Sequence, residues 1–200
     1  GYRAPNLSEL GSNGAHEGTN RYEYGNTNLE SEKSLQFDAG MEWSNEHISF
    51  TGNAFYNNVT NYIFYQKLIG ANGGDSIINN EDNEYFAFAY NQQDAKLIGA
   101  EFNLDIHPHP LDGLHIENTV SIVNGTFKKA LAGSINLPSI PSMRWITELR
   151  YELPKNTGKL KNSYASLQFD NVAAQNNPFT GYNTETKTPG YTLINIGAGT

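Results

Sequence analysis

Residues 35–43 read Leu-Gln-Phe-Asp-Ala-Gly-Met-Glu-Trp, in which every second residue is apolar and the residues between are polar, apart from one glycine. Side chains along a β-strand point alternately to its two faces, so this stretch predicts a strand with one apolar and one polar face. The alternation recurs about seven times along the chain. We expect strands at approximately 34–43, 48–64, 85–106, 114–127, 144–151, 164–173 and 190–197.

The connections between these strands are alternately long and short. The long ones cover about 6–32, 65–83, 128–141 and 174–189, and the short ones cover 44–47, 107–113 and 154–158. Transmembrane barrels have short periplasmic turns at one end and long extracellular loops at the other. Strands of about ten residues also meet the ~9–11 residues that a tilted strand needs to cross a bilayer. We therefore predict an all-β fold, an antiparallel up-and-down transmembrane β-barrel.

The composition excludes several other classes of protein. A net charge of −8 over 200 residues leaves no basic stripe for displacing counterions from phosphates, so no nucleic-acid partner is expected. The chain has no cysteine and therefore no disulfide framework. No run of about 18 apolar residues suits a membrane-spanning helix. Gly1–Pro5 lacks the basic start and apolar core of a signal peptide.

Two motifs near the N-terminus resemble those of a known family. Residues 2–10, Tyr-Arg-Ala-Pro-Asn-Leu-Ser-Glu-Leu, resemble the aromatic-Arg-Ala-Pro box of TonB-dependent outer-membrane receptors. Residues 25–32, Gly-Asn-Thr-Asn-Leu-Glu-Ser-Glu, resemble the Asn-Pro-Asn-Leu-x-x-Glu box of that family, with Thr27 where proline is usual. Segments similar to later family elements follow in the expected order at 40–43, 54–63, 97–102, 138–145 and 188–193.

The resemblance implies a barrel of the 22-strand type, closed by an N-terminal plug domain. Such receptors of the Gram-negative outer membrane bind scarce ligands, such as ferric siderophores, haem, cobalamin, metal chelates or glycans. The TonB complex then drives import through the plug. Residues 1–200 contain no segment similar to the plug and only about seven of the strands. We expect a part of the barrel, truncated at both ends, with outer-membrane lipid, a small-molecule or metal-chelate ligand and the TonB complex as the receptor's partners.

Four residues are candidates for ligand binding at the extracellular mouth. His16 lies between the two N-terminal boxes, where haem receptors of the family carry a haem-ligating histidine; the alternative is an ordinary loop histidine. Arg3 suits an anionic siderophore, but pairing with Glu9 or a barrel-wall carboxylate is the alternative that we favour. Tyr22 and Tyr24 offer both a ring for stacking and a hydroxyl.

No motif in the sequence indicates catalysis or a resident cofactor. The chain has no nucleophile elbow, no phosphate-binding glycine loop and no zinc-type spacing, so we predict neither an enzyme nor catalytic residues. His107 and His109 flank prolines in a predicted periplasmic turn, on the opposite side from the ligand, and we expect no metal site there.

A soluble β-sandwich, serving as an adhesin or a carbohydrate-binding module, is the alternative fold. The two folds differ in what covers the apolar faces of the strands. In a sandwich, Phe37, Phe50 and Phe102 would be buried between two sheets, whereas in a membrane barrel they would face lipid.

Overall fold

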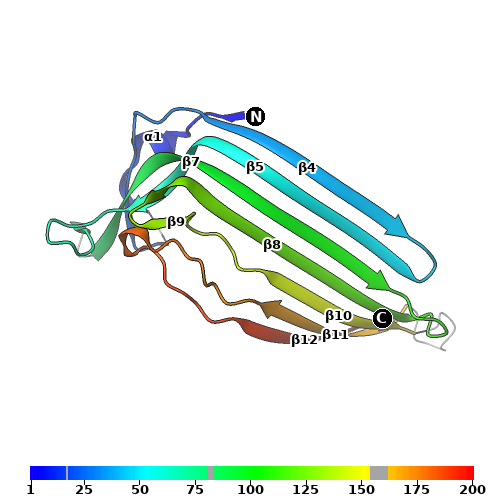
Figure 1. The fold of residues 1–200 in the computed structure, drawn as a ribbon. Coiled ribbons are helices and arrows are strands. Elements are labelled where there is room, and N and C mark those ends of the chain that lie inside the picture. The colour runs from blue at the N-terminus through cyan, green and yellow to red at the C-terminus, as the bar shows by residue number, and fades with distance from the viewer. Residues whose placement is uncertain (17, 81–82, 154–161) are drawn as a thin grey trace.

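A computed structural model describes residues 1–16, 18–80, 83–153 and 162–200, which form one 12-stranded sheet (Figure 1). Eight strands follow one another in chain order as neighbours, each antiparallel to the next. They are β1 (Tyr2–Arg3), β4 (Glu32–Ser44), β5 (Ile48–Lys67), β7 (Asn83–Ile106), β8 (Leu114–Leu131), β10 (Arg144–Glu152), β11 (Tyr164–Val172) and β12 (Tyr191–Gly199).

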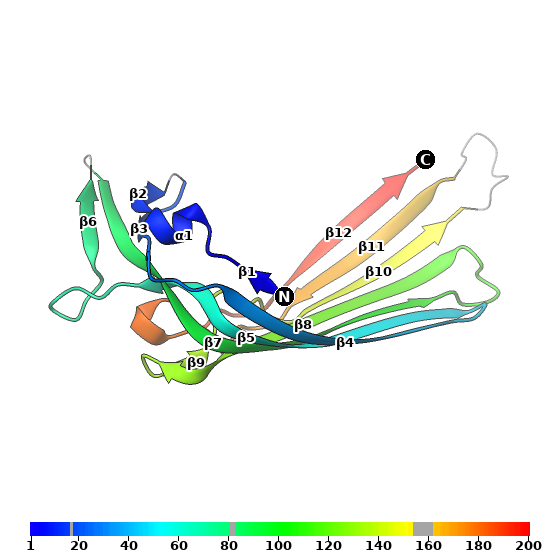
Figure 2. The same cartoon turned by 90° about the horizontal axis from the view of Figure 1, so that it is seen from above.

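All seven predicted strands are confirmed, and β1, a strand of two residues, is an eighth. The alternation of connections is confirmed for the described residues, and the predicted turn at 154–158 lies outside them. Among the described residues, none of the helices has the length and apolar content needed to span a membrane. The sheet is open, with β1 and β12 at the ends of the strand order, and Figure 2 shows it as a curved wall.

The long connections contain more secondary structure than the sequence predicted. Residues 6–32, predicted as a loop, form a short helix and a hairpin. The helix begins after Asn6 because this residue and Glu9 form a capping box, in which each side chain accepts a hydrogen bond of 2.8 Å from the other's backbone N–H. The additional elements are α1 (Leu7–Gly11), β2 (Asn13–His16), β3 (Arg21–Tyr24), β6 (Ile77–Asn80), β9 (Ser134–Asn136) and the 3-10 helix η1 (Gly181–Asn183).

The apolar faces of the strands join into one exposed surface. Phe37 is 64% exposed and Phe102 is 43% exposed, and within the described ranges no second sheet covers them. The alternative β-sandwich is therefore wrong. We call this surface the apolar face and the opposite one the polar face. Large side chains of the apolar face are Leu35, Phe37, Met41, Trp43, Tyr56, Ile98, Phe102, Ile122, Trp145, Leu149, Tyr151, Ile194 and Ile196.

A β-bulge in β5 changes which side chains point to the polar face. The pairing of β5 with β7 shifts by one residue between Val59 and Tyr62, so Val59 and Phe64 both lie opposite odd-numbered residues of β7. An extra residue in one strand reverses the order of the faces beyond it. Asn61 occupies the bulge with φ of 58°, a left-handed conformation that asparagine tolerates better than most residues. The bulge thereby turns Tyr62 and Phe64 inward.

Phe64 belongs to a buried apolar cluster at the long-loop end of the wall. The ring of Phe127 on β8 lies 4.8 Å from that of Phe64 and 5.8 Å from that of Phe179, measured between centroids. Leu137 and Ala95 complete the buried part of this loop core, which is formed by Phe64, Ala95, Phe127, Leu137 and Phe179. Leu137 and Phe179 come from two different long connections. The loop core therefore fastens both loops to the wall.

Replacing Asn61 tests the role of the bulge. We expect Asn61→Val to destabilise the loop end by about 1–3 kcal/mol, because a β-branched residue is strained at positive φ. The change also removes the amide that donates to Glu30 at 3.1 Å. Asn61→Gly keeps the backbone conformation and should cost less. Hydrogen exchange of residues 62–67 in the two variants measures the difference, and equal protection in both would contradict the role given to the backbone.

Candidate functional site

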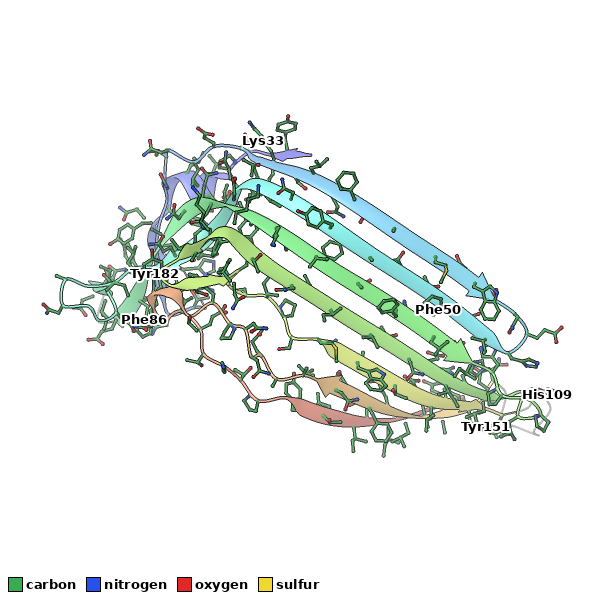
Figure 3. All side chains as sticks on the ribbon, viewed as in Figure 1. Lys33, Phe50, Phe86, His109, Tyr151 and Tyr182 are labelled. Atoms are coloured by element: carbon green, nitrogen blue, oxygen red, sulfur yellow. The ribbon has the colours of Figure 1, made fainter. Side chains whose placement is uncertain are left out.

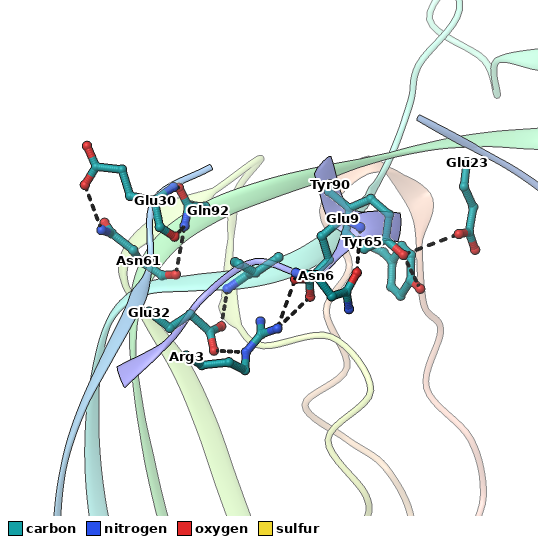
Figure 4. A network of polar contacts seen from close by, with 11 residues as sticks. Arg3, Asn6, Glu9, Glu23, Glu30, Glu32, Asn61, Tyr65, Tyr90 and Gln92 are labelled. Atoms are coloured by element: carbon teal, nitrogen blue, oxygen red, sulfur yellow. Dashed lines mark hydrogen bonds and ion pairs between the residues drawn. The ribbon is translucent and has the colours of Figure 1, made fainter. Parts of the chain in front are cut away.

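Arg3 and two carboxylates lie at the centre of a polar network at the long-loop end (Figure 4). Nη1 of Arg3 donates to both carboxylate oxygens of Glu9 at 2.9 Å, and Nε of Arg3 donates to Oε2 of Glu32 at 2.6 Å. Glu9 is only 7% exposed, so it requires a cationic partner. The favoured alternative for Arg3, pairing with Glu9 or a wall carboxylate, is confirmed for both carboxylates. Arg3 thus ties α1 to β4.

A second group of polar contacts fixes the chain just before β4. The amide of Gln92 on β7 accepts from the backbone N–H of Glu30 at 2.8 Å and donates to the carbonyl oxygen of Glu30 at 2.5 Å. The same amide nitrogen donates to the carbonyl oxygen of Asn61 at 3.2 Å. The last residues of the second N-terminal box therefore serve to anchor the loop to β5 and β7.

A polar cavity of about 410 Å³ lies beside this network. Residues from α1, β2, β3, β5 and β7 line it, including His16, Glu23, Tyr65 and Tyr90. Tyr65 and Tyr90 face each other across the β5–β7 pairing, with their rings 4.5 Å apart and their hydroxyl oxygens separated by 2.7 Å. The Tyr90 hydroxyl also donates to Oε2 of Glu23 at 3.4 Å. The cavity therefore combines a carboxylate, two phenols and an imidazole.

The carboxylate in this cavity is withdrawn from water. Glu23 is 5% exposed, and Tyr90 lies beside it on the part of β7 that continues beyond the wall to pair with β3. Burial, the hydrogen bond with Tyr65 and the charge of Glu23 raise the pKa of the Tyr90 phenol above its ordinary value. Tyr90 consequently stays a neutral donor. The guanidinium of Arg21 lies 5.4 Å from the centre of the Tyr65 ring and adds a cation–π contact.

The structure places the four predicted binding residues in different settings. His16, at the end of β2, lines the cavity together with Glu23. Tyr22 and Tyr24 lie on the other face of β3 from Glu23, with their rings 5.0 Å apart, and the Tyr22 hydroxyl donates to Asn13 at 3.3 Å. Among the described residues that line the cavity, neither these tyrosines nor Arg3 is present.

Sequence reasoning did not identify the carboxylate of this cavity, Glu23, or its two phenols, Tyr65 and Tyr90. Glu23 was hidden because residues 6–32 were predicted as a loop, in which no face could be assigned to it. Tyr65 and Tyr90 are 25 residues apart and meet only through the pairing of β5 with β7. Tyr65 begins the predicted connection 65–83, but Tyr90 lies inside the predicted strand 85–106, so no feature of the sequence pairs the two tyrosines.

A second cluster of polar side chains lies at the opposite, short-turn end of the wall. Asp105, His107 and His115 place one potential ligand atom each within 4.8 Å of the others. In the sequence, His107 and His109 stand together in one predicted turn, where no metal site was expected. The structure instead pairs His109 with Asp112 at 2.8 Å and brings His107 to Asp105 and His115, because β7 and β8 are neighbours.

Comparison with a protein-family model and with solved structures shows what the chain is similar to. A family model described as TonB dependent receptor-like, beta-barrel matches residues 1–200. The copper transporter OprC is similar in structure, with a TM-score of 0.70 and 16% identity over 98% of this chain and 26% of that one. The ferric enterobactin receptor PfeA of Pseudomonas aeruginosa is also similar, with a TM-score of 0.59 and 18% identity over 98% of this chain and 29% of that one.

A third similar structure is the siderophore receptor PirA of Acinetobacter baumannii. Its TM-score is 0.55 at 14% identity, over 98% of this chain and 31% of that one. At these identities the likeness shows a shared fold. The chain spans less than a third of the length of each of these three proteins.

Proposed function

The chain belongs to the TonB-dependent receptor β-barrel family, and we propose that it forms part of the wall of an outer-membrane receptor that imports a scarce ligand. The ligand we propose is a ferric siderophore, haem or another metal chelate. Import in this proposal is driven by the TonB complex acting through a plug domain. The ligand passes chemically unchanged, and no residue is assigned a catalytic role.

The observation that carries this proposal is the contrast between the two faces of one sheet. The apolar face has no protein partner within the described residues and suits the hydrocarbon of a bilayer. The polar face carries side chains such as Glu101, Arg144 and Glu148, which suit a hydrated interior. Long loops at one end and short turns at the other give such a wall an extracellular and a periplasmic side.

The cavity at the long-loop end is our proposed contact point for the ligand. Its carboxylate, phenols and imidazole favour a polar ligand with several hydrogen-bonding groups. Iron chelates of siderophores carry such groups, and imidazole is an axial ligand of haem iron. His16 is the residue that separates these ligand classes, because it would contribute a coordinating nitrogen only to haem or another metal centre.

Growth assays test the proposed import. A Gram-negative strain that lacks its own iron receptors would express the complete receptor containing this chain. Each candidate, haemin or a single ferric siderophore, is then supplied as the only iron source. Growth that depends on both the receptor and TonB supports the proposal. Absence of TonB-dependent growth or uptake with every iron source, although the receptor is folded in the outer membrane, would overturn it.

Substitutions in the cavity test its role in ligand binding. We expect Glu23→Gln and Tyr90→Phe to weaken binding roughly 10–100-fold, because hydrogen bonds that involve a charged group contribute about 1.5–3 kcal/mol. Tyr85→Phe on the same strand is the matched control, since Tyr85 does not contribute to the cavity lining among the described residues. Binding of the ligand identified by growth is measured on the purified receptor. Equal affinities for Tyr90→Phe and the control would contradict the assignment.

A further inference from the structure

Four of the five histidines of the chain gather at the short-turn end of the wall. His47 precedes β5, and its carbonyl oxygen accepts from the backbone N–H of His107 at 2.7 Å. The ring of His47 lies 6.2 Å from that of His109, and Figure 3 places His109 at this end together with Tyr151. His115 lies near the start of β8, across from the end of β7. These histidines come from three separate parts of the chain.

Two of them surround the carboxylate of Asp105. Oδ2 of Asp105 lies 2.5 Å from Nε2 of His107 and 3.8 Å from Nδ1 of His115. The two imidazole rings meet edge to face, with their centroids 4.6 Å apart. Asp105 lies on the polar face at the end of β7, and His107 directly follows the last residue of that strand. Strand geometry thus aims one carboxylate and two imidazoles at a single point.

The other carboxylate oxygen of Asp105 has no hydrogen-bond partner among the described residues. Oδ1 is buried and accepts no hydrogen bond in the part of the chain that the structure describes. A buried acceptor without a donor costs about 1–3 kcal/mol, so such an atom requires an explanation. A simple Asp–His pair would explain His107 alone. It leaves both the orphan Oδ1 and the approach of His115 unexplained.

The surrounding charges favour a cation at this point. Glu117 lies opposite Asp105 in the β7–β8 pairing, and Glu148 lies opposite Glu117 in the next one. Among the described residues, Arg150 is the cation that lies opposite His115 in the β8–β10 pairing. Its guanidinium is turned away, since Nε donates to Glu152 at 3.2 Å and the group stacks 3.9 Å from the centre of the Tyr164 ring.

We propose that Asp105, His107 and His115 bind a divalent first-row transition-metal ion at the short-turn rim. Two imidazole nitrogens and one carboxylate oxygen suit Zn²⁺, Co²⁺, Ni²⁺ or Cu²⁺, and open positions remain for water. Metal–ligand bonds of about 2.0–2.2 Å place ligand atoms roughly 3.3 Å apart. The present ligand atoms lie within 4.8 Å of one another, so small side-chain rotations suffice. If the carboxylate of Asp105 binds through both oxygens, the ion would satisfy Oδ1 as well as Oδ2, and it would link the end of β7 to β8.

This site goes beyond the proposed function and does not depend on which ligand is imported. It lies at the opposite end of the strands from the polar cavity, and the two sites have no residue in common. A receptor that imported nothing containing a metal would still have it. The two proposals therefore fail separately.

Titration of the complete receptor with ZnCl₂ tests the site. The untagged protein, purified in detergent and stripped with a chelator, is titrated by calorimetry, and Co²⁺ absorption reports the geometry of coordination. We expect His115→Ala and Asp105→Asn to abolish one Zn²⁺ equivalent or to weaken it at least about 100-fold, since loss even of outer-shell partners costs about 10–100-fold. Asp105→Asn keeps the shape of the side chain and so preserves the fold.

His109→Ala is the matched control, because His109 lies in the same turn with a 68% exposed side chain and contacts Asp112 instead. The control should bind the same number of Zn²⁺ ions as the unmodified receptor, with the same affinity. Loss of one equivalent in the cluster variants and its retention in the control supports the proposal. Equal Zn²⁺ binding in the unmodified receptor and in both cluster variants, each folded as judged by heat-modifiable migration, would overturn it.

Discussion

Replacing Phe102 by arginine is expected to destabilise the barrel by about 2–4 kcal/mol, because a charged side chain on the lipid face near the middle of a bilayer costs that much. Phe102 lies in the interior of the wall, paired with Gly52 on one side and Val120 on the other. Its side chain is 43% exposed on the apolar face. Urea titration of the complete receptor folded into lipid vesicles measures the change in the free energy of unfolding.

The matched control is Asn103→Arg, one residue further along the same strand. Asn103 lies on the polar face, where it accepts a hydrogen bond of 2.9 Å from the Thr119 hydroxyl. Its replacement loses that bond but keeps the new charge out of hydrocarbon, so we expect a cost near 1 kcal/mol. Equal costs for the two variants would mean that the apolar face does not contact lipid, which would refute the membrane placement of the wall.

Replacing Phe127 by alanine should remove about 3–5 kcal/mol from the loop core, the range measured when a buried aromatic side chain is truncated. Phe127 is fully buried and contacts the rings of both Phe64 and Phe179. Because the loop core lies at one end of the strands, the expected effect is local. Hydrogen exchange should show lost protection around Leu137 and Phe179, with little change in the strands of the wall.

Ile77→Ala is the control for this experiment. Ile77 belongs to the same end of the molecule, on β6, but it is 49% exposed and contributes little buried area. Its truncation should leave the protection of both loops unchanged. If Phe127→Ala left the exchange of residues 137 and 179 as it was, the loop core would not be what holds the two connections to the wall.

The polar cavity shows where prediction from sequence stopped. His16 was identified because it lies between two recognisable boxes, and it lines the cavity. Glu23 was missed because its face depends on a hairpin within a predicted loop.

The loop core was missed for a different reason. Tyr62 and Phe64 could be placed in a strand, but the bulge at Asn61 decided their direction. A single inserted residue moves the side chains of the strand to the opposite face, and it does so only for the residues beyond the insertion.

The amino-acid sequence was enough to predict the strands, the two faces of the wall, the long-loop and short-turn ends, and the family. These properties depend on residues that are close together in the sequence, so they can be recognised before the fold is known. Contacts between distant side chains could be identified only once the chain was seen folded. The Tyr65–Tyr90 contact, the loop core and the cluster of Asp105 with His107 and His115 depend on strand register and on loops folding back over the wall. Register couples residues that lie far apart along the chain, so no local pattern contains it.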